Sequence, residues 1–243
     1  MKVPAAQPHA PLVALEDDVF LVRGSLRLQP LLRISRNMTV LRHAGELTLV
    51  NPMRLGEAGM AALAQLGRVR RLLSLGAMHG IDDAWYRAHF PGVEHWCRPG
   101  SRRYPAPAGH HRLAPDHLPP LPGLQLFSFD AATQPESALL LTTPVAGRGG
   151  LLLTCDSLQH YGDYAHHSLM AKAAMPLLGF PRTTVVGPIW LKEVSPPGGS
   201  LRPDFERLLR DWRFDRLIAA HGSYLPDGAQ AKVAAAVARA FPA

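Results

Sequence analysis

The pattern of hydrophobic and polar positions divides the chain into two halves that follow one plan, short apolar runs followed by amphipathic segments. In the first half, brief runs rich in valine and leucine predict strands, two of which form a hairpin. A helix is expected over residues 56–66, because Met60, Leu63 and Leu66 share one face. The strands are expected at residues 19–23, 38–42, 47–50 and 72–75, and a short helix at 82–87.

The second half begins after residues 99–122, a stretch with seven prolines and three histidines that predicts an irregular connection. Three successive apolar runs then indicate a β-meander, and a last strand precedes a C-terminal helix. Strands are expected at 124–129, 137–142, 150–154 and 216–220, and helices at 167–178, 203–212 and 227–240. Strands followed by helices in both halves predict an α/β (α+β) fold with sheets covered by helices.

Length and composition are sufficient for one buried core, since the chain has 243 residues and is 47% hydrophobic. We expect a single domain over residues 1–243, with residues 1–14 as a loose N-terminal extension. No stretch approaches the ~20 apolar residues that span a membrane, and no signal core is present, so no membrane partner is expected. Two cysteines, Cys97 and Cys155, are too few for a disulfide framework and favour a cytoplasmic setting.

The net charge of +7 raises the question of an anionic partner. Only Lys2, Lys172, Lys192 and Lys232 are lysines among the 26 basic residues, and the arginines are scattered. A nucleic-acid footprint requires clustered rather than merely abundant charge. We therefore expect a small-molecule substrate or ligand and no nucleic acid, while the oligomeric state has no signature in the sequence.

Three predicted strands end on side chains that bind metals or transfer protons. His79, Asp82 and Asp83 follow the run at 72–75, Asp156 follows the third strand of the meander, and His221 follows the last strand. Imidazole and carboxylate groups are common metal ligands and acid–base groups. Because each follows a strand, their side chains are expected in one pocket at a sheet edge.

Each of these residues taken alone has an ordinary structural explanation. Asp82 or Asp83 can cap the following helix, and Asp156 and His221 can occupy turns. Other catalytic patterns are missing from the sequence, because it has neither a Gly-x-Ser-x-Gly nucleophile elbow nor a phosphate-binding glycine loop. The agreement of order and spacing across three strands favours a shared functional pocket.

The order of elements and strand-end residues resembles the metallo-β-lactamase superfamily. That resemblance covers roughly residues 15–240 and implies a four-layer αββα sandwich with a metal site along one sheet edge. The first metal motif of the family is His-x-His-x-Asp-His. Here His79 takes its first place, Ile81 the third, Asp83 the fifth and Ala84 the sixth, so the motif is degenerate.

The later family motifs are matched in part. Asp156 corresponds to the bridging aspartate of the family, although Cys155 replaces the glycine that usually precedes it, and His221 corresponds to the last histidine. The remaining family histidine has no clear counterpart. Glu136 lies near its expected place and is a candidate oxygen ligand.

The resemblance implies that only one of the two family metal positions keeps three ligands. These are Asp83, Asp156 and His221, with His79 as a fourth ligand, so at most one divalent ion is expected, Zn, Fe or Mn, and the ion can also be absent. Asp83 and Asp156 are the expected catalytic residues. Further residues expected to line the pocket are Asp82, Glu136, His166 and His167.

Two functions remain open at this point. The first is single-metal hydrolysis of an ester, thioester, lactone or phosphoester. In the second, a catalytically inactive family member serves as a small-molecule or protein binding module, an alternative favoured by the loss of the three-histidine position.

Overall fold

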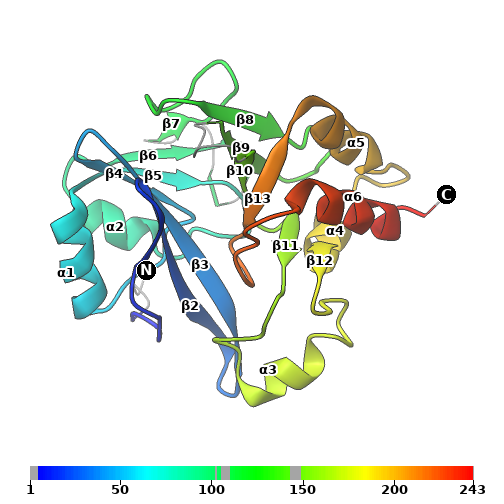
Figure 1. Ribbon diagram of the computed structural model, residues 1–243, viewed down its shortest axis with the longest axis horizontal. Helices are drawn as coiled ribbons and strands as arrows, with labels where there is room; N and C mark the ends of the chain where they lie inside the picture. Colours follow the sequence, from blue (N-terminus) through cyan, green and yellow to red (C-terminus); the bar gives the residue numbers. More distant parts are fainter. Residues whose placement is uncertain (1–4, 102, 105–109, 143–148, 243) are drawn as a thin grey trace.

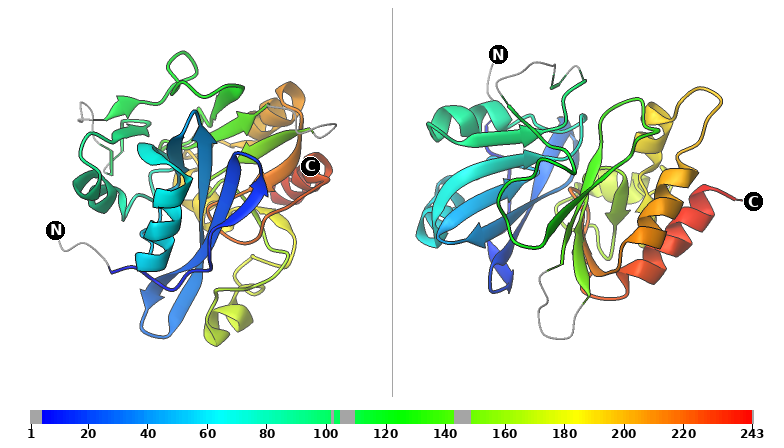
Figure 2. Two further views of the ribbon diagram at one scale, coloured as in Figure 1. Left: turned by 60° about the vertical axis from the view of Figure 1, so that its left-hand side comes forward. Right: turned by 90° about the horizontal axis from the view of Figure 1, so that it is seen from above.

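Two β-sheets lie face to face and carry helices on their outer faces (Figures 1 and 2). The computed structural model describes residues 5–101, 103–104, 110–142 and 149–242. This arrangement confirms the α/β (α+β) class and the αββα sandwich expected from the sequence. Within the described residues, no helix combines the length and the apolar character needed to cross a membrane.

The first sheet has seven strands in sequential order. Its first four strands are antiparallel, and the later ones run parallel to their neighbours. A long hairpin, β2 with β3, extends beyond the rest of this sheet (Figure 1). The strands are β1 (Val13–Glu16), β2 (Val19–Gln29), β3 (Leu32–His43), β4 (Glu46–Val50), β5 (Arg68–Ser74), β6 (Glu94–Cys97) and β7 (His111–Arg112).

The second sheet has four strands in the order β13-β10-β9-β8. The predicted meander forms its antiparallel part, and the last strand joins it in parallel to β10. A separate two-stranded sheet pairs β11 with β12. The strands are β8 (Leu124–Ser128), β9 (Ser137–Leu141), β10 (Gly150–Leu153), β11 (Leu158–His160), β12 (Thr184–Val186) and β13 (Phe214–Ile218).

Helices form the two outer layers (Figure 2). Two cover the first sheet, α1 (Glu57–Leu66) and α2 (Asp83–His89), and three cover the second sheet, α4 (Pro188–Val194), α5 (Arg202–Asp211) and α6 (Ala229–Ala240). The short α3 (Leu169–Ala174) stands apart from these layers and lies beside the β2–β3 hairpin (Figure 1).

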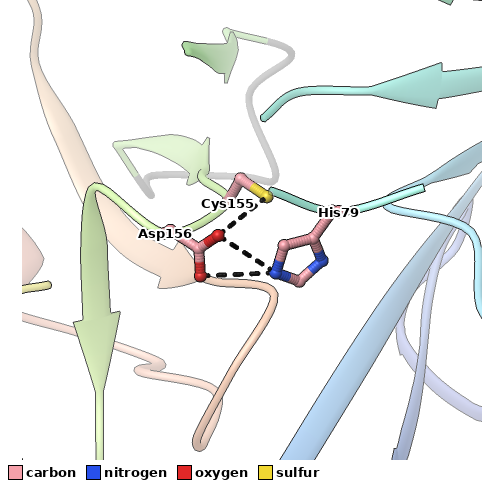
Figure 3. Close-up of side chains that lie close together, drawn as sticks. All are labelled: His79, Cys155 and Asp156. Atoms are coloured by element: carbon pink, nitrogen blue, oxygen red, sulfur yellow. Dashed lines mark hydrogen bonds and ion pairs between the residues drawn. The ribbon is translucent and has the colours of Figure 1, made fainter. Parts of the chain in front are cut away.

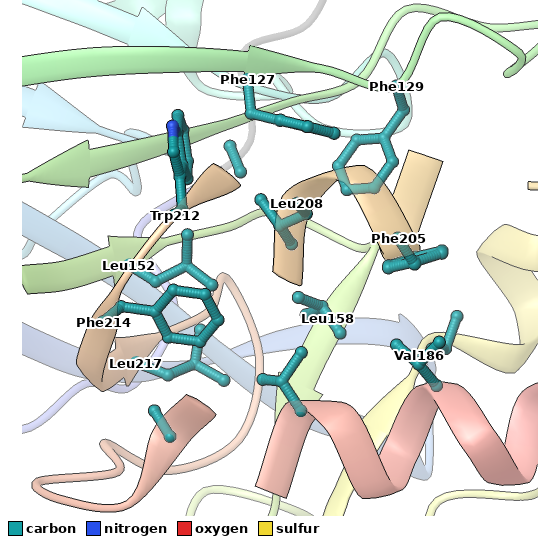
Figure 4. Packing of buried hydrophobic residues seen from close by; sticks show 14 of the residues in the cluster. Phe127, Phe129, Leu152, Leu158, Val186, Phe205, Leu208, Trp212, Phe214 and Leu217 are labelled. Carbon is teal, nitrogen blue, oxygen red and sulfur yellow. The ribbon is translucent and has the colours of Figure 1, made fainter. Parts of the chain in front are cut away.

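Alternation along the strands explains how the layers pack. On β2, Val19 and Leu21 join the cluster between the sheets, whereas Phe20 and Val22 join the cluster beneath α1 and α2. Successive side chains of a strand point to opposite faces, so a strand buried on both sides is apolar throughout. A third cluster, built largely from aromatic and leucine side chains, fills the space between the second sheet and its helices (Figure 4).

The N-terminal segment differs from the expected loose extension over residues 1–14. From Pro8 onward it lies along β2, with the Ala10 amide donating to the Arg23 carbonyl at 2.7 Å and the Ser25 amide donating to the Pro8 carbonyl at 3.0 Å. Backbone pairing of this kind satisfies donors and acceptors at the sheet edge. Residues 8–14 therefore belong to the sheet structure, while residues 1–4 lie outside the described residues.

Several short elements were not expected from the pattern, namely β1, β6, β7, β11, β12 and α4. Each is two to seven residues long, too short for a periodicity to be recognised. The helix expected over 167–178 is confined to α3, since Pro176 lacks the backbone donor needed to continue it. Both cysteines are unpaired and buried.

Candidate metal site

Three strand ends bring His79, Asp156 and His221 together between the sheets. The Nε2 atoms of the two histidines are 3.1 Å apart, and the Nε2 of His221 lies 3.3 Å from Oδ1 of Asp156. The Nε2 of His79 lies 3.3 Å from Oδ1 and 3.2 Å from Oδ2 of the same carboxylate. All three residues are at least 90% buried. They lie far apart in the sequence and meet because β5, β10 and β13 end at the same edge.

The spacing of these three side chains fits a tetrahedral ion. Zinc bonds to nitrogen and oxygen are about 2.0–2.1 Å long, which places neighbouring ligand atoms about 3.3 Å apart. The observed separations of 3.1–3.3 Å match that edge length. Two imidazoles and one carboxylate also form a donor set that suits zinc, iron or manganese. The described residues therefore fit one ion with an open fourth position.

A contact from the first sheet fixes the tautomer of His221. Its Nδ1 lies 2.6 Å from the backbone carbonyl oxygen of Ser35, so Nδ1 carries the proton and donates it. The lone pair of Nε2 is then directed at His79 and Asp156. Second partners of this kind hold metal-ligating histidines in the correct orientation in known metal sites.

The electrostatic setting keeps the ligands in the forms that bind metals. Burial lowers the pKa of His79 despite the opposing effect of Asp156, so its imidazole is neutral. Burial raises the pKa of Asp156, but the favourable interactions of its carboxylate with His79 and His221 outweigh this effect and hold that pKa below its usual range. A neutral imidazole and an ionised carboxylate are the ligand forms.

Cys155 lies next to the three-residue site. From the sequence it was noted only as the residue that replaces the family glycine. Its Sγ lies within 4.8 Å of the ligand atoms of His79 and Asp156, and 4.0 Å from Oδ2 of Asp156 (Figure 3). Burial and then the Asp156 carboxylate raise the pKa of this thiol well above its ordinary value. We describe the site as the two histidines and one aspartate whose ligand atoms lie 3.1–3.3 Å from one another, with the Cys155 thiol as a neighbour of that site.

Glu136 lies behind Asp156 instead of among the ligands, which corrects the expectation that it replaces the missing histidine. Its Oε1 accepts hydrogen bonds from the backbone amides of Asp156 and Ser157 at 2.8 and 2.9 Å. Burial and the Asp156 carboxylate raise its pKa well above the ordinary value. Glu136 is only 1% exposed, and its two hydrogen bonds hold the Asp156 turn in place.

Asp83 contacts a different set of residues, so its expected role as a metal ligand stays a prediction without support from its contacts. Its Oδ2 accepts from the hydroxyls of Ser74 and Tyr104, both at 2.8 Å, and lies 3.2 Å from Nε2 of His95. Burial raises the pKa of Asp83, but the hydrogen bonds from His95, Tyr104 and Ser74 outweigh it and lower the pKa. Oδ2 of this carboxylate thus has its partners away from the three-residue site, whereas the buried Oδ1 has no partner among the described residues.

Asp82 is likewise not a pocket residue. It forms an ion pair of 2.5 Å with Arg36, whose side chain is only 3% exposed, and accepts from the backbone amide of Arg54 at 3.0 Å. Arg36 also donates to the Pro52 carbonyl at 2.6 Å. The side chain of Asp82 makes no capping hydrogen bond to α2. Its role is to neutralise a buried guanidinium in the first sheet.

The two histidines expected to line the pocket lie at its periphery. His167 is buried beside β3, where its Nε2 lies 3.5 Å from the backbone nitrogen of Ser35 and its Nδ1 3.2 Å from the Ala165 carbonyl. His166 is half-buried and has a positive φ of 66°. Burial lowers the pKa of both imidazoles. Neither contributes an atom to the three-residue site.

Two buried asparagines that the sequence did not single out hold the strand ends in place. Asn37 donates from Nδ2 to the carbonyls of Ala219 and Gly222 at 2.9 and 3.2 Å, on both sides of His221. Asn51 donates to the Thr154 carbonyl at 2.9 Å, just before Asp156. Asn37 lies within β3 and Asn51 directly follows β4, and a polar amide at such a position beside apolar residues is the sequence signal that could have identified them.

Replacement of Asn37 by alanine should lower the free energy of unfolding by about 1–3 kcal/mol, because two buried carbonyls lose their donor. Urea denaturation followed by circular dichroism measures this loss. Thr142→Ala is a matched control, since it removes an exposed hydrogen bond to the Gly123 carbonyl and should change stability by less than about 0.5 kcal/mol. Equal effects of the two replacements would contradict the role of Asn37.

A largely apolar cavity of about 320 Å³ opens from the three-residue site. His79, Asp156 and His221 form one end of it, and the β2–β3 hairpin and α3 form its walls. Ligand sites are typically concave and mostly apolar with a few convergent polar groups. The geometry thus combines a candidate metal site with adjoining space for a ligand.

Comparison with solved structures identifies this architecture as the metallo-β-lactamase fold. The metallo-β-lactamase FIM-1 from Pseudomonas aeruginosa, in its mono-zinc form, superposes with a TM-score of 0.63 at 12% identity over 98% of this chain and 99% of that one. DIM-1 exposed to ceftazidime gives 0.62 at 10% identity, covering 98% and 100%. A metallo-β-lactamase from Erythrobacter litoralis gives 0.60 at 12%, covering 94% and 96%.

Sequence comparisons add nothing to this structural similarity, because no protein-family model and no curated protein matches the chain. At such low identity the similarity establishes the fold, and the chemistry has to be argued from the site itself.

Proposed function

We propose that the protein is a metal-dependent hydrolase that holds one divalent ion through His79, Asp156 and His221. The observation that carries this proposal is the convergence of three ligand atoms at 3.1–3.3 Å from one another at the end of an apolar cavity. Ligand lone pairs at such separations repel one another unless a cation or a proton lies between them. The degenerate family motif is consistent with one ion rather than two.

The residues around the site have distinct roles in this proposal. A bound ion would polarise the substrate oxygen and lower the pKa of a coordinated water. Asp156 supplies the negative charge that holds the cation and orients the nucleophilic water. Ser35 keeps His221 in the metal-binding tautomer, and the apolar walls exclude bulk water, which strengthens electrostatic interactions within the site.

The substrate class follows from what such a site can activate. An ester, thioester, lactone or phosphoester presents an oxygen that the ion can polarise and a bond that water can break. A catalytically inactive binding module is the second candidate. The contacts of Asp83 favour an inactive binding module, because they leave three metal ligands where the resemblance implied four. Asp83 contacts Ser74, His95 and Tyr104 instead.

Elemental analysis of protein purified without chelator should find about one equivalent of Zn, Fe or Mn per chain, because the described site provides one set of three ligands. Replacing a residue that only supports a metal ligand typically costs about 10–100-fold in metal affinity. His221→Ala removes a ligand itself and should therefore reduce metal affinity at least about 100-fold. His111→Ala, an exposed histidine stacked on Trp96, is the matched control and should retain the metal. Two tightly bound ions, or unchanged metal content in His221→Ala, would refute the assignment.

A panel of aryl esters, thioesters, a lactone and a phosphodiester separates the two candidate functions. The hydrolase proposal predicts turnover that chelators remove and added metal restores. A protein with neither metal nor turnover would instead be a binding module.

A further inference from the structure

The cavity beside the three-residue site lies between two elements that project from the sandwich. One wall is the β2–β3 hairpin and the other is α3 with the residues that follow it, which lie side by side (Figure 1). The hairpin contributes four aliphatic side chains to the cavity, Leu26, Leu28, Leu32 and Ile34. The α3 segment contributes Ala171, Ala174, Met175 and Leu178.

Few polar groups line the cavity. Apart from the three candidate ligands, they are the side chains of Gln159 and Tyr161 and the indole nitrogen of Trp190. The Tyr161 hydroxyl donates to Oε1 of Gln159 at 2.7 Å, and Nε2 of Gln159 donates to the Asp156 carbonyl at 3.2 Å. A ligand beyond the site therefore meets aliphatic and aromatic surface, which favours an apolar group.

The mouth of the cavity is also apolar. Several lining side chains remain about half exposed, including Leu28 at 52%, Leu178 at 59% and Ile189 at 53%. Exposed apolar side chains that gather around one opening, rather than being scattered singly, mark a binding surface. The same opening leads to the carboxylate and imidazoles at the inner end.

Size and charge limit what can occupy the cavity. Its volume of about 320 Å³ is at the lower end for small-molecule sites, and a helix about 10 Å across does not fit. Residues 24–34 and 164–192, which form both walls, contain no acidic residue but carry five basic ones, Arg27, Arg33, Lys172, Arg182 and Lys192. This charge disfavours a basic amphipathic segment and leaves a neutral or anionic small molecule.

We propose that the substrate is an amphiphile with one flexible apolar chain, which occupies the cavity between the β2–β3 hairpin and α3 while its scissile acyl bond lies at His79, Asp156 and His221. This inference rests on the proposed hydrolase function for the reacting end. The chain-binding part stands on the cavity alone and is tested without turnover.

Titration calorimetry with straight-chain carboxylates from butanoate to decanoate tests the chain-binding part. Each buried methylene contributes about 0.8 kcal/mol, so affinity should rise about fourfold per methylene until the cavity is filled. Ala174→Phe fills the cavity from α3 and should abolish that rise. Ala173→Phe, on the same helix but exposed and outside the cavity lining, should leave it unchanged.

A second pair of variants tests the same point independently, in case Ala174→Phe fails to fold. Leu28→Gln changes a half-exposed lining residue, whereas Leu31→Gln changes a 71%-exposed residue of the same hairpin outside the lining. Leu28→Gln should weaken decanoate binding at least fourfold and leave butanoate unaffected, with Leu31→Gln unchanged. Affinity independent of chain length, or equal effects within either pair, would overturn the inference.

The outcome is distinct from that of the hydrolase test. Binding that depends on chain length without any turnover would support the proposal that the cavity binds an apolar chain and would contradict the hydrolase proposal. Turnover that is equal for acetyl and octanoyl esters would retain the hydrolase and reject the apolar chain.

Discussion

Asp156→Asn should reduce metal-dependent hydrolysis at least 100-fold while the protein stays folded. The replacement keeps the shape of the side chain but removes the charge that faces both His79 and His221. Loss of a residue that merely supports a ligand costs 10–100-fold in metal affinity or activity, and loss of the ligand itself should cost at least the upper figure. Metal content and turnover measured on the same sample give the result.

The control for this prediction is Asp211→Asn, which alters an exposed carboxylate paired with Arg210. It should retain both metal and activity. If Asp156→Asn hydrolyses substrate as fast as the unaltered protein at equal metal content, Asp156 has no role in the reaction.

Asp82→Ala should lower the free energy of unfolding by about 3–5 kcal/mol, because it leaves the buried Arg36 guanidinium without its counter-ion. Urea denaturation measures this loss. Asp18→Ala, which breaks an exposed pair with Arg42, should cost less than about 1 kcal/mol.

A double replacement distinguishes charge from packing at this pair. Arg36→Met combined with Asp82→Leu removes both charges and should recover much of the stability lost in Asp82→Ala. A loss in Asp82→Ala no larger than that of Asp18→Ala would show that the buried ion pair does not contribute as argued.

The fold could be predicted from the sequence because most of its strands contain continuous apolar runs. The runs in β2, β9 and β10 are typical of strands buried on both faces, and their alternate side chains join clusters on opposite sides of the sheet. Elements of three or four residues, such as β6 and β12, form only because neighbouring strands pair with them. Tertiary context of that kind has no local signature.

Only those site residues that lie close after the end of a strand could be predicted from the sequence. His79, Asp156 and His221 each lie close after a strand that ends at the same edge, so topology brings them together. Asp83 lies four residues after His79, yet it faces Tyr104 and His95. A turn through Gly80, with a φ of 88°, separates the two side chains, and sequence spacing does not encode that direction.

Anomalous diffraction from crystals grown with zinc tests the metal assignment most directly. The account predicts one zinc peak about 2.0–2.2 Å from Nε2 of His79, Nε2 of His221 and a carboxylate oxygen of Asp156. The absence of a peak at these residues, or a peak at Asp83 and His95 instead, would contradict it.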